Sequence, residues 1–192
     1  VLTNAANSLA DVEIDNTGRD VTLTNTTATN ISAGGIQGDS VKLNTAGLTQ
    51  TGAITATSLD VTNSAGSVVL TNAANSLADV EIDNTGNSVS FTNAAATNIS
   101  AGGIQGSLVT LNTVGLTQTG SIDASAKLTV TNTQGDVTLT QLNSLAAIEI
   151  VNPLGVIDVK STESMSVNGN GITGDSVSLD VTGDLTAFAD IT

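Results

Sequence analysis

Apolar and polar residues alternate in short runs along the whole chain. Clear examples are VEID at 12–15, LDVT at 59–62, LTVT at 128–131 and IEIV at 148–151. A period of two residues places one set of side chains in a core and the other in solvent. β-branched residues are abundant, while Glu, Lys, Arg, Gln and Met are scarce. The pattern therefore predicts an all-β protein.

A long repeat organises these strands. The first eighteen residues, VLTNAANSLADVEIDNTG, return unchanged at 69–86, and 1–53 aligned with 69–121 gives 42 identities at 53 positions. A more divergent copy includes NSLAAIEIVN at 143–152. We predict one repeat segment over 1–192, with 68-residue repeats at 1–68, 69–136 and 137–192, the last of them partial. Since Val1 is not an initiator, we interpret the chain as a piece of a longer protein.

Each repeat divides further into three coils of about 22 residues, each with two alternating strands, a Gly-containing turn between them and a less regular third strand. This arrangement predicts a right-handed parallel β-helix, a solenoid with three short strands per coil and about eight coils. One column of inward positions is predicted to contain Val21, Val41, Val68, Val89, Val109, Val137, Ile157 and Val177. Glycine is expected where the chain needs positive φ or close backbone approach. The predicted turn glycines are Gly18, Gly38, Gly66, Gly86, Gly106, Gly135, Gly155 and Gly174.

Other repeat architectures fit the pattern less well. Helical solenoids need segments with the period of an α-helix, and a β-sandwich has less reason to repeat at so short and regular an interval. Calcium-binding nonapeptide β-rolls need tandem glycine–aspartate motifs, whereas GGIQGD at 34–39 stands alone. Asparagines that follow strands are expected to hydrogen-bond their own turn or to stack between coils. These are Asn25, Asn72, Asn93 and Asn132.

The charge balance restricts the partners. The net charge is −14, and the only cations are Arg19, Lys42, Lys127 and Lys160. Nucleic acids and anionic membrane surfaces are recognised by clustered Lys and Arg, so neither is expected as a partner. The chain has no Cys and no His, which excludes disulfides and the usual zinc sites. No run of about 20 apolar residues predicts a membrane span, and no cofactor is expected.

Two acidic pairs are the strongest candidates for chemistry. Glu13 and Asp15 are expected on one face of one strand, and Glu81 and Asp83 repeat the arrangement. Paired carboxylates perform glycoside hydrolysis on some β-helices, and carboxylate oxygens also bind Ca²⁺. However, the pair occurs twice and is lost at Val151 in the third copy, whereas an active site is normally single. We predict a solvated acidic face and no enzyme activity, with a calcium contact as the alternative.

Threonines and glycosylation sequons offer two further hypotheses. Rows of outward Thr on a flat β-helix can order water and bind ice, but here residues such as Lys42 and Asp158 interrupt them. Thr is also a favourable outward residue in any strand, which is the interpretation we prefer. Acceptor sequons for N-glycosylation occur at 25–27, 30–32 and 98–100, although they arise easily in a chain so rich in Asn and Thr.

Several coils carry a family resemblance. DVEIDNTGRDVTLTN at 11–25, LDVTNSAGSVVLTN at 59–72 and LTVTNTQGDVTLTQ at 128–141 resemble the filamentous haemagglutinin repeats of large bacterial exoproteins. The resemblance covers essentially the whole chain, but the secretion domain of that family is not in it. It implies a fibre at the bacterial surface or released from it, exported unfolded through an outer-membrane secretion pore by the two-partner pathway. It also implies attachment to host cells, neighbouring cells or biofilm matrix.

Two functions from different classes follow from these observations. The first is a structural shaft in such an adhesin, for which the near-identical repeats are the motivation. The second is a binding module whose sides contact extracellular polysaccharide, cell surfaces or other fibres directly. A polysaccharide-degrading β-helix enzyme is a distant third.

Overall fold

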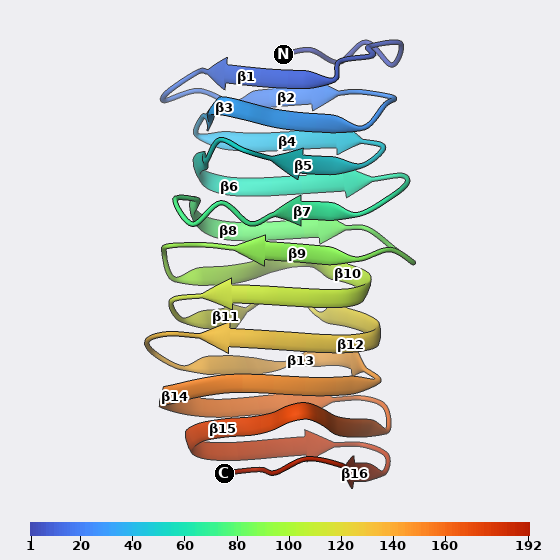
Figure 1. The fold of residues 1–192 in the computed structure, drawn as a ribbon, viewed down its shortest axis with the longest axis vertical. Helices are drawn as coiled ribbons and strands as arrows, with labels where there is room; N and C mark the ends of the chain where they lie inside the picture. Colours follow the sequence, from blue (N-terminus) through green and yellow to red (C-terminus); the bar gives the residue numbers. More distant parts are fainter.

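A computed structural model describes all 192 residues and shows an all-β chain without helices (Figure 1). The alternating segments form the strands, because each buries one face and exposes the other. The sixteen strands are β1 (Asp11–Asp15), β2 (Val21–Thr24), β3 (Thr29–Gln37), β4 (Ser40–Thr45), β5 (Leu48–Gln50), β6 (Ile54–Asn63), β7 (Val68–Leu70), β8 (Ser76–Asp83), β9 (Val89–Thr92), β10 (Thr97–Thr113), β11 (Leu116–Gln118), β12 (Ile122–Asn132), β13 (Val137–Leu145), β14 (Ala147–Ser161), β15 (Met165–Val181) and β16 (Leu185–Ala187).

Every strand pairs in parallel with a strand of the next turn, which confirms the predicted parallel β-helix. In Figure 1 the strands nearer the viewer, such as β9 and β12, run to the left, while β4, β6 and β8 behind them run to the right. Because the chain descends as it winds, the coil is right-handed. It makes about nine turns, which at roughly 4.8 Å per turn gives a rod on the order of 40 Å long.

The register between turns fixes the length of a turn. Eight steps along one column of paired residues lead from Thr29 to Ala187, so a turn is slightly shorter than the coil that the sequence spacing suggested. The column consists of Thr29, Leu48, Val68, Val89, Val109, Leu128, Ile148, Val167 and Ala187.

Each turn has two broad sides and one short corner strand. We call the side of β1, β3, β5, β7 and β9 the front and the side of β2, β4, β6 and β8 the back. From β10 onward the long strands continue around a corner from one side to the other, as β10 does between Ile99 and Val109. The corner pairings, such as Ile36 with Ile54 and Ile104 with Ile122, account for the predicted third strand.

The sequence repeat does not equal a whole number of turns. Between β1 and its copy within β8 the chain passes seven half-turns, so one 68-residue repeat takes about three and a half turns. Consequently, Val12 lies on the front, whereas its equivalent Val80 lies on the back. The predicted inward residues do face the core, since seven of the eight are buried and Val177 packs against the buried cluster. They do not form a single column, however: Val21 and Val41 pair on the back, but Val68 and Val89 pair on the front.

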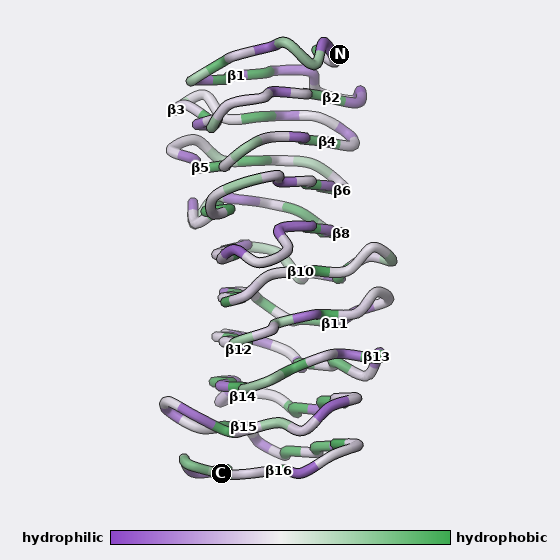
Figure 2. Tube along the Cα trace, turned by 90° about the vertical axis from the view of Figure 1, so that its right-hand side faces the viewer, coloured by the Kyte–Doolittle hydropathy of each residue, from purple (hydrophilic) through white to green (hydrophobic).

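The core is aliphatic and continuous along the rod. One cluster of 37 buried residues consists of Val, Ile, Leu and Ala with one Phe and one Met, Phe91 and Met165. Apolar and polar segments alternate around each turn of the tube in Figure 2. Each inward side chain stacks on another in the turns above and below, so burial increases with every added turn.

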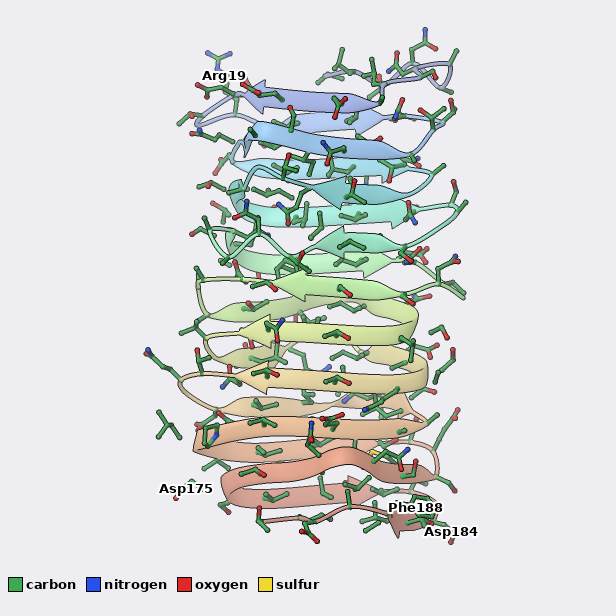
Figure 3. The ribbon with its side chains drawn as sticks, viewed as in Figure 1. Arg19, Asp175, Asp184 and Phe188 are labelled. Atoms are coloured by element: carbon green, nitrogen blue, oxygen red, sulfur yellow. The ribbon has the colours of Figure 1, made fainter.

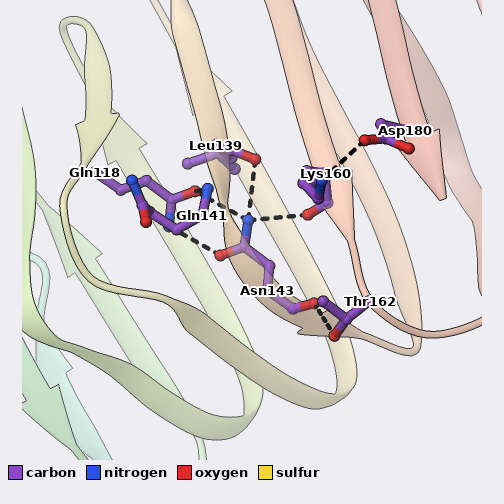
Figure 4. Close-up of polar contacts among 7 residues, drawn as sticks. All are labelled: Gln118, Leu139, Gln141, Asn143, Lys160, Thr162 and Asp180. Atoms are coloured by element: carbon purple, nitrogen blue, oxygen red, sulfur yellow. Dashed lines mark hydrogen bonds and ion pairs between the residues drawn. The ribbon is translucent and has the colours of Figure 1, made fainter. Parts of the chain in front are cut away.

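Buried amides form a second, polar part of the interior. Every buried side-chain nitrogen and oxygen has a hydrogen-bond partner. Asn143 is the fullest case: its Nδ2 shares its two hydrogens among Gln118 Oε1, Leu139 O and Lys160 O, which lie at 2.9, 3.0 and 3.0 Å. These contacts link three successive turns (Figure 4). Its Oδ1 accepts from Gln118 Nε2 at 2.8 Å. The eight buried asparagines are Asn25, Asn63, Asn75, Asn84, Asn93, Asn132, Asn143 and Asn152.

The predicted roles of the asparagines after strands are confirmed. The Asn25 side chain bridges to the backbone of Leu9, and Asn132 Nδ2 donates to Asn152 Oδ1 at 3.0 Å between turns. Asn72 instead accepts from Ala74 N within its own turn. Asn25 is also the first residue of a glycosylation sequon, and its burial is incompatible with a glycan on the folded protein.

The glycines divide into two groups. Gly18, Gly66, Gly86 and Gly135 have positive φ, as predicted for turns. The other four do not, and of these Gly106, Gly155 and Gly174 lie inside strands. They, and Gly38, are required instead by close approach: a Cβ on Gly155 would lie 2.1 Å from Gly135 O, and tight contacts also surround Gly38, Gly106 and Gly174.

Candidate functional site

The predicted acidic pairs lie on opposite sides of the rod. Glu13 and Asp15 are on β1 at the front, and Glu81 and Asp83 occupy equivalent positions of β8 at the back. Each aspartate is held by the loop that follows its strand: Thr17 Oγ1 donates to Asp15 at 2.8 Å, and Thr85 Oγ1 donates to Asp83 at 2.9 Å. The two pairs are therefore independent surface features.

Each glutamate lies against a glycine of a strand bulge. Gly34 N donates to Glu13 Oε2 at 3.2 Å, and Gly102 N donates to Glu81 Oε2 at the same distance. A Cβ on Gly34 would lie 2.0 Å from the Glu13 carboxyl carbon, so only glycine leaves room for this contact. The GGIQG segments are thus bulges that receive a glutamate.

No metal centre is assembled by these groups. The structure contains no group of three or more acidic side chains placed to hold a metal ion. One acidic pair on a strand supplies fewer oxygens than the six to eight that Ca²⁺ takes. The candidate positions Glu13, Asp15, Glu81 and Asp83 therefore do not come together into a calcium site.

Three of the four cations pair with a carboxylate on the next turn. Lys42 pairs with Asp60, and this hydrogen bond and charge raise the pKa of Lys42. Lys160 lies 3.1 Å from Asp180. Arg19, which makes no ion pair, projects from a turn near the N-terminal end in Figure 3, far from the labelled Asp175 and Asp184. The remaining carboxylates leave a strongly acidic exterior.

Glu149 is the third copy of the bulge glutamate and is largely buried. Lys127 pairs with it, and the Asn170 amide also donates to it. The hydrogen bond from Lys127, opposed by burial and assisted by Asn170, lowers the pKa of Glu149 below its ordinary value of 4.5. Thus the third repeat converts a solvated acid into an internal ion pair.

The outward threonines do not form a flat, uninterrupted row. Along the back, the row of outward residues that begins at Thr22 continues on the following turns with Lys42, Asp60 and Glu81. Along the front, Thr110 and Thr129 are followed by Glu149. Charged residues therefore break each of these rows within a few turns.

The front side carries a shallow groove that the alternation of residues along the chain does not predict. It has a volume of about 410 Å³ and crosses the beginnings of the front strands. The small residues Ala10, Ala28 and Gly47 line this groove together with the polar residues Asn30 and Thr49. Asn30 Nδ2 donates to Asp11 Oδ1 at 2.8 Å, and Thr49 Oγ1 donates to Asn30 Oδ1 at 3.3 Å. We call this the front groove.

The back side carries a similar groove one repeat later. This back groove has a volume of about 390 Å³ and is lined by Ala78, Asp79, Ala96, Asn98 and Thr117, among others. Asn98 Nδ2 donates to Asp79 at 2.7 Å, as Asn30 does to Asp11. The last turn differs, because Asp136 and Thr138 line the back groove where Ser67 and Val69 line the front groove. Since a repeat takes three and a half turns, the two grooves face opposite ways.

The third repeat lacks this arrangement. Ala147 stands where the earlier repeats have Asp11 and Asp79, and Ser166 stands where they have Asn30 and Asn98. On the following turn, Thr186 pairs with Ser166, and Leu185 precedes Thr186. No hydrogen-bonded carboxylate–amide row can form there.

No protein-family model, characterised protein or solved structure matches this chain. The structure also contains no helix that could cross a membrane.

The sequence contained signals for the features that were missed. The doublets Gly34–Gly35 and Gly102–Gly103 mark the bulges, because Gly35 and Gly103 have φ of 75° and 79°. The grooves depend on pairings between successive turns, which are shorter than the predicted coils. The longer predicted spacing misaligns Asp11, Asn30 and Thr49, so their proximity was not recognised.

Proposed function

We propose that this chain is a structural shaft segment of an extracellular bacterial adhesin fibre. The observation that supports this most is the unbroken register of paired residues from Thr29 to Ala187. A rod held together by the same contacts at every turn transmits position and force along its length. Length in such a rod is set by the number of turns.

The interior supports the same proposal. Apolar columns and buried amides recur along the rod, and no buried polar side-chain atom is left without a partner. The chain is strongly acidic, with a net charge of −14, which favours solubility of an extended fibre. The two acidic pairs are repeated and separated, which favours a solvated surface over catalysis.

Export and attachment belong to this proposal as well. The resemblance to filamentous haemagglutinin repeats suggests passage through an outer-membrane secretion pore and display at the cell surface. A chain without cysteine forms no disulfide that would obstruct threading. Attachment to host cells, neighbouring cells or biofilm matrix would then be performed at the end of the fibre.

A replacement experiment tests the shaft. The chain is displayed between a surface anchor and a known adhesive domain, and is then exchanged for an equal number of turns from an unrelated β-helix. We expect cell attachment to be unchanged by the exchange and to fall when turns are removed. Loss of attachment after the exchange, with the fibre still displayed at full length, would contradict a purely structural role.

The repeated grooves favour a second candidate, direct binding along the sides of the rod. Two equivalent hydrogen-bonding surfaces on one molecule would combine weak contacts into useful avidity. Attachment by the displayed chain without the adhesive domain would support this candidate.

A further inference from the structure

We propose that the front and back grooves bind an uncharged, hydroxyl-rich polysaccharide, and that one molecule holds two such chains on opposite sides. This inference rests on the second candidate function, direct binding, and is independent of the shaft role. It assigns a ligand class and a number of sites to surfaces that the repeat places at fixed positions.

The polar groups of each groove suit sugar hydroxyls. Asp79 and Asp136 line the back groove, and Asp11 lies beside the front groove, where its carboxylate accepts from Asn30. Carboxylates accept hydrogen bonds, and the hydroxyls of Thr49 and Thr117 both donate and accept. The amides of Asn30 and Asn98 are fixed by their bonds to the carboxylates, at 2.8 and 2.7 Å. A prearranged set of acceptors and donors loses little side-chain entropy when a ligand binds.

Charge selects among polysaccharides. The chain has a net charge of −14, and no lysine or arginine lines either groove. An anionic polymer would be repelled by Asp79 and Asp136 in the back groove, and by Asp11 beside the front groove, without any compensating cation. Sugar hydroxyls, by contrast, donate to a carboxylate without carrying a charge of their own.

The direction of the grooves suits a polymer. Asp11, Asn30 and Thr49 lie on three successive turns, so similar polar positions recur along the rod at roughly 4.8 Å. That spacing is comparable with the length of one sugar unit. A glycan lying parallel to the rod can therefore place successive sugars against successive turns.

The half-turn in each repeat makes the molecule bivalent. The front groove lies across β3 to β7, and the back groove lies across β8 to β13. Because the grooves face opposite ways, a single glycan chain cannot occupy both without wrapping around the rod. One protein molecule therefore joins two glycan chains. Because the third repeat lacks the groove, we expect two sites on this molecule and not three.

The test uses the 192-residue chain, four single variants and the double variant Ala28→Gln/Ala96→Gln. Ala28→Gln fills the front groove and Ala96→Gln fills the back groove, since both alanines are exposed at the groove edge. Ala33→Gln and Ala101→Gln are the matched controls, because these exposed alanines are also one repeat apart but line neither groove. Probes are neutral hexasaccharides of glucose, galactose and mannose, with polygalacturonate as the anionic comparison. Binding is followed by calorimetry, and bridging by clustering of beads coated with the neutral glycan that binds.

We expect two sites for a neutral glycan on the wild type, one site on each groove variant, and none on the double groove variant. Bead clustering should fall at least tenfold in either single groove variant, although half of the binding remains. The control variants should behave as the wild type. The proposal is overturned if no neutral hexasaccharide binds, if polygalacturonate binds more tightly, or if clustering survives in both single groove variants. None of these results would affect the shaft, which is tested by replacement and not by glycan binding.

Discussion

At the scale of single residues, burial decides what each polar side chain does. Asn143 and Asn44 are the same residue type in the same kind of strand, but one is fully buried among five hydrogen bonds and the other is exposed. An exposed amide exchanges one hydrogen-bond partner for water at little cost. A buried amide cannot, so its neighbours depend on it.

Asn143→Ala should therefore lower the free energy of unfolding by about 2–3 kcal/mol, because Gln118 and the backbone of Ile122 lose buried partners. Asn44→Ala should change it by less than about 0.5 kcal/mol. Denaturant unfolding followed by circular dichroism measures both. Equal effects of the two substitutions would show that the amide network does not stabilise the rod.

Glu149 makes a prediction about pH. Its pKa is lowered in the folded state, so the ionised carboxylate contributes stability above pH 4.5 and loses that contribution as the pH falls through the folded-state pKa. Glu149→Gln should cost about 1–2 kcal/mol at neutral pH. The difference from wild type should shrink steadily below pH 4.5.

Glu163→Gln is the control for this titration, because Glu163 is exposed and makes no ion pair. It should leave the free energy of unfolding nearly unchanged throughout the range. If the Glu149→Gln deficit stays constant while the pH falls, the ion pair with Lys127 is not the source of the stability.

At the scale of elements, the strand bulges and turns use glycine for different reasons. Gly86 and Gly103 have nearly the same φ, 80° and 79°, but a Cβ on Gly86 meets nothing within 4 Å, while one on Gly103 would lie 2.1 Å from Ser121 O. Substitutions at Gly86 and Gly103 therefore separate the cost of a positive φ from the cost of a steric clash.

Gly86→Ala should destabilise the protein by about 1 kcal/mol, the cost of a left-handed conformation with a side chain. Gly103→Ala should cost about 2–4 kcal/mol, because the strand must also move away from Ser121. Thermal and denaturant unfolding of the two variants side by side measure the difference. Similar losses would mean that the bulge yields without breaking its pairing with β12.

The sequence predicts the strands better than it predicts their partners. Alternation of apolar residues identified segments such as 12–15 and 128–131, because the period depends only on neighbouring residues. Pairing between turns depends on the corner lengths, which vary with each bulge. The equivalent Glu13 and Glu81 were found as a repeated pair, but their placement on opposite sides needed the true turn length.

At the scale of the whole molecule, the rod can be shortened without loss of stability only by deletions that preserve its buried amide contacts. Deleting residues 69–137 removes one repeat together with Val137, and the segment beginning at Thr138 then follows Val68. Asn143 takes the place of Asn75 beside Gln50, so the buried amide pair is restored. Deleting residues 68–127 removes three whole turns and returns Leu128 to the position of Val68, but it leaves Gln50 without that asparagine.

We therefore expect the variant that lacks 69–137 to fold cooperatively with a β-rich spectrum. The variant that lacks 68–127 should unfold at a clearly lower denaturant concentration, although it is slightly longer. Circular dichroism and limited proteolysis compare the two. Greater stability of the whole-turn deletion would show that matching turns matters more than matching buried amides.

The half-turn left over in each repeat also links length to direction. Adding one repeat to such a rod moves everything that follows it outward and also points it to the opposite side. Adding two repeats extends the rod and restores the original direction. Variants with odd and even numbers of repeats would thus differ in length and also in the side of the rod to which their far end points.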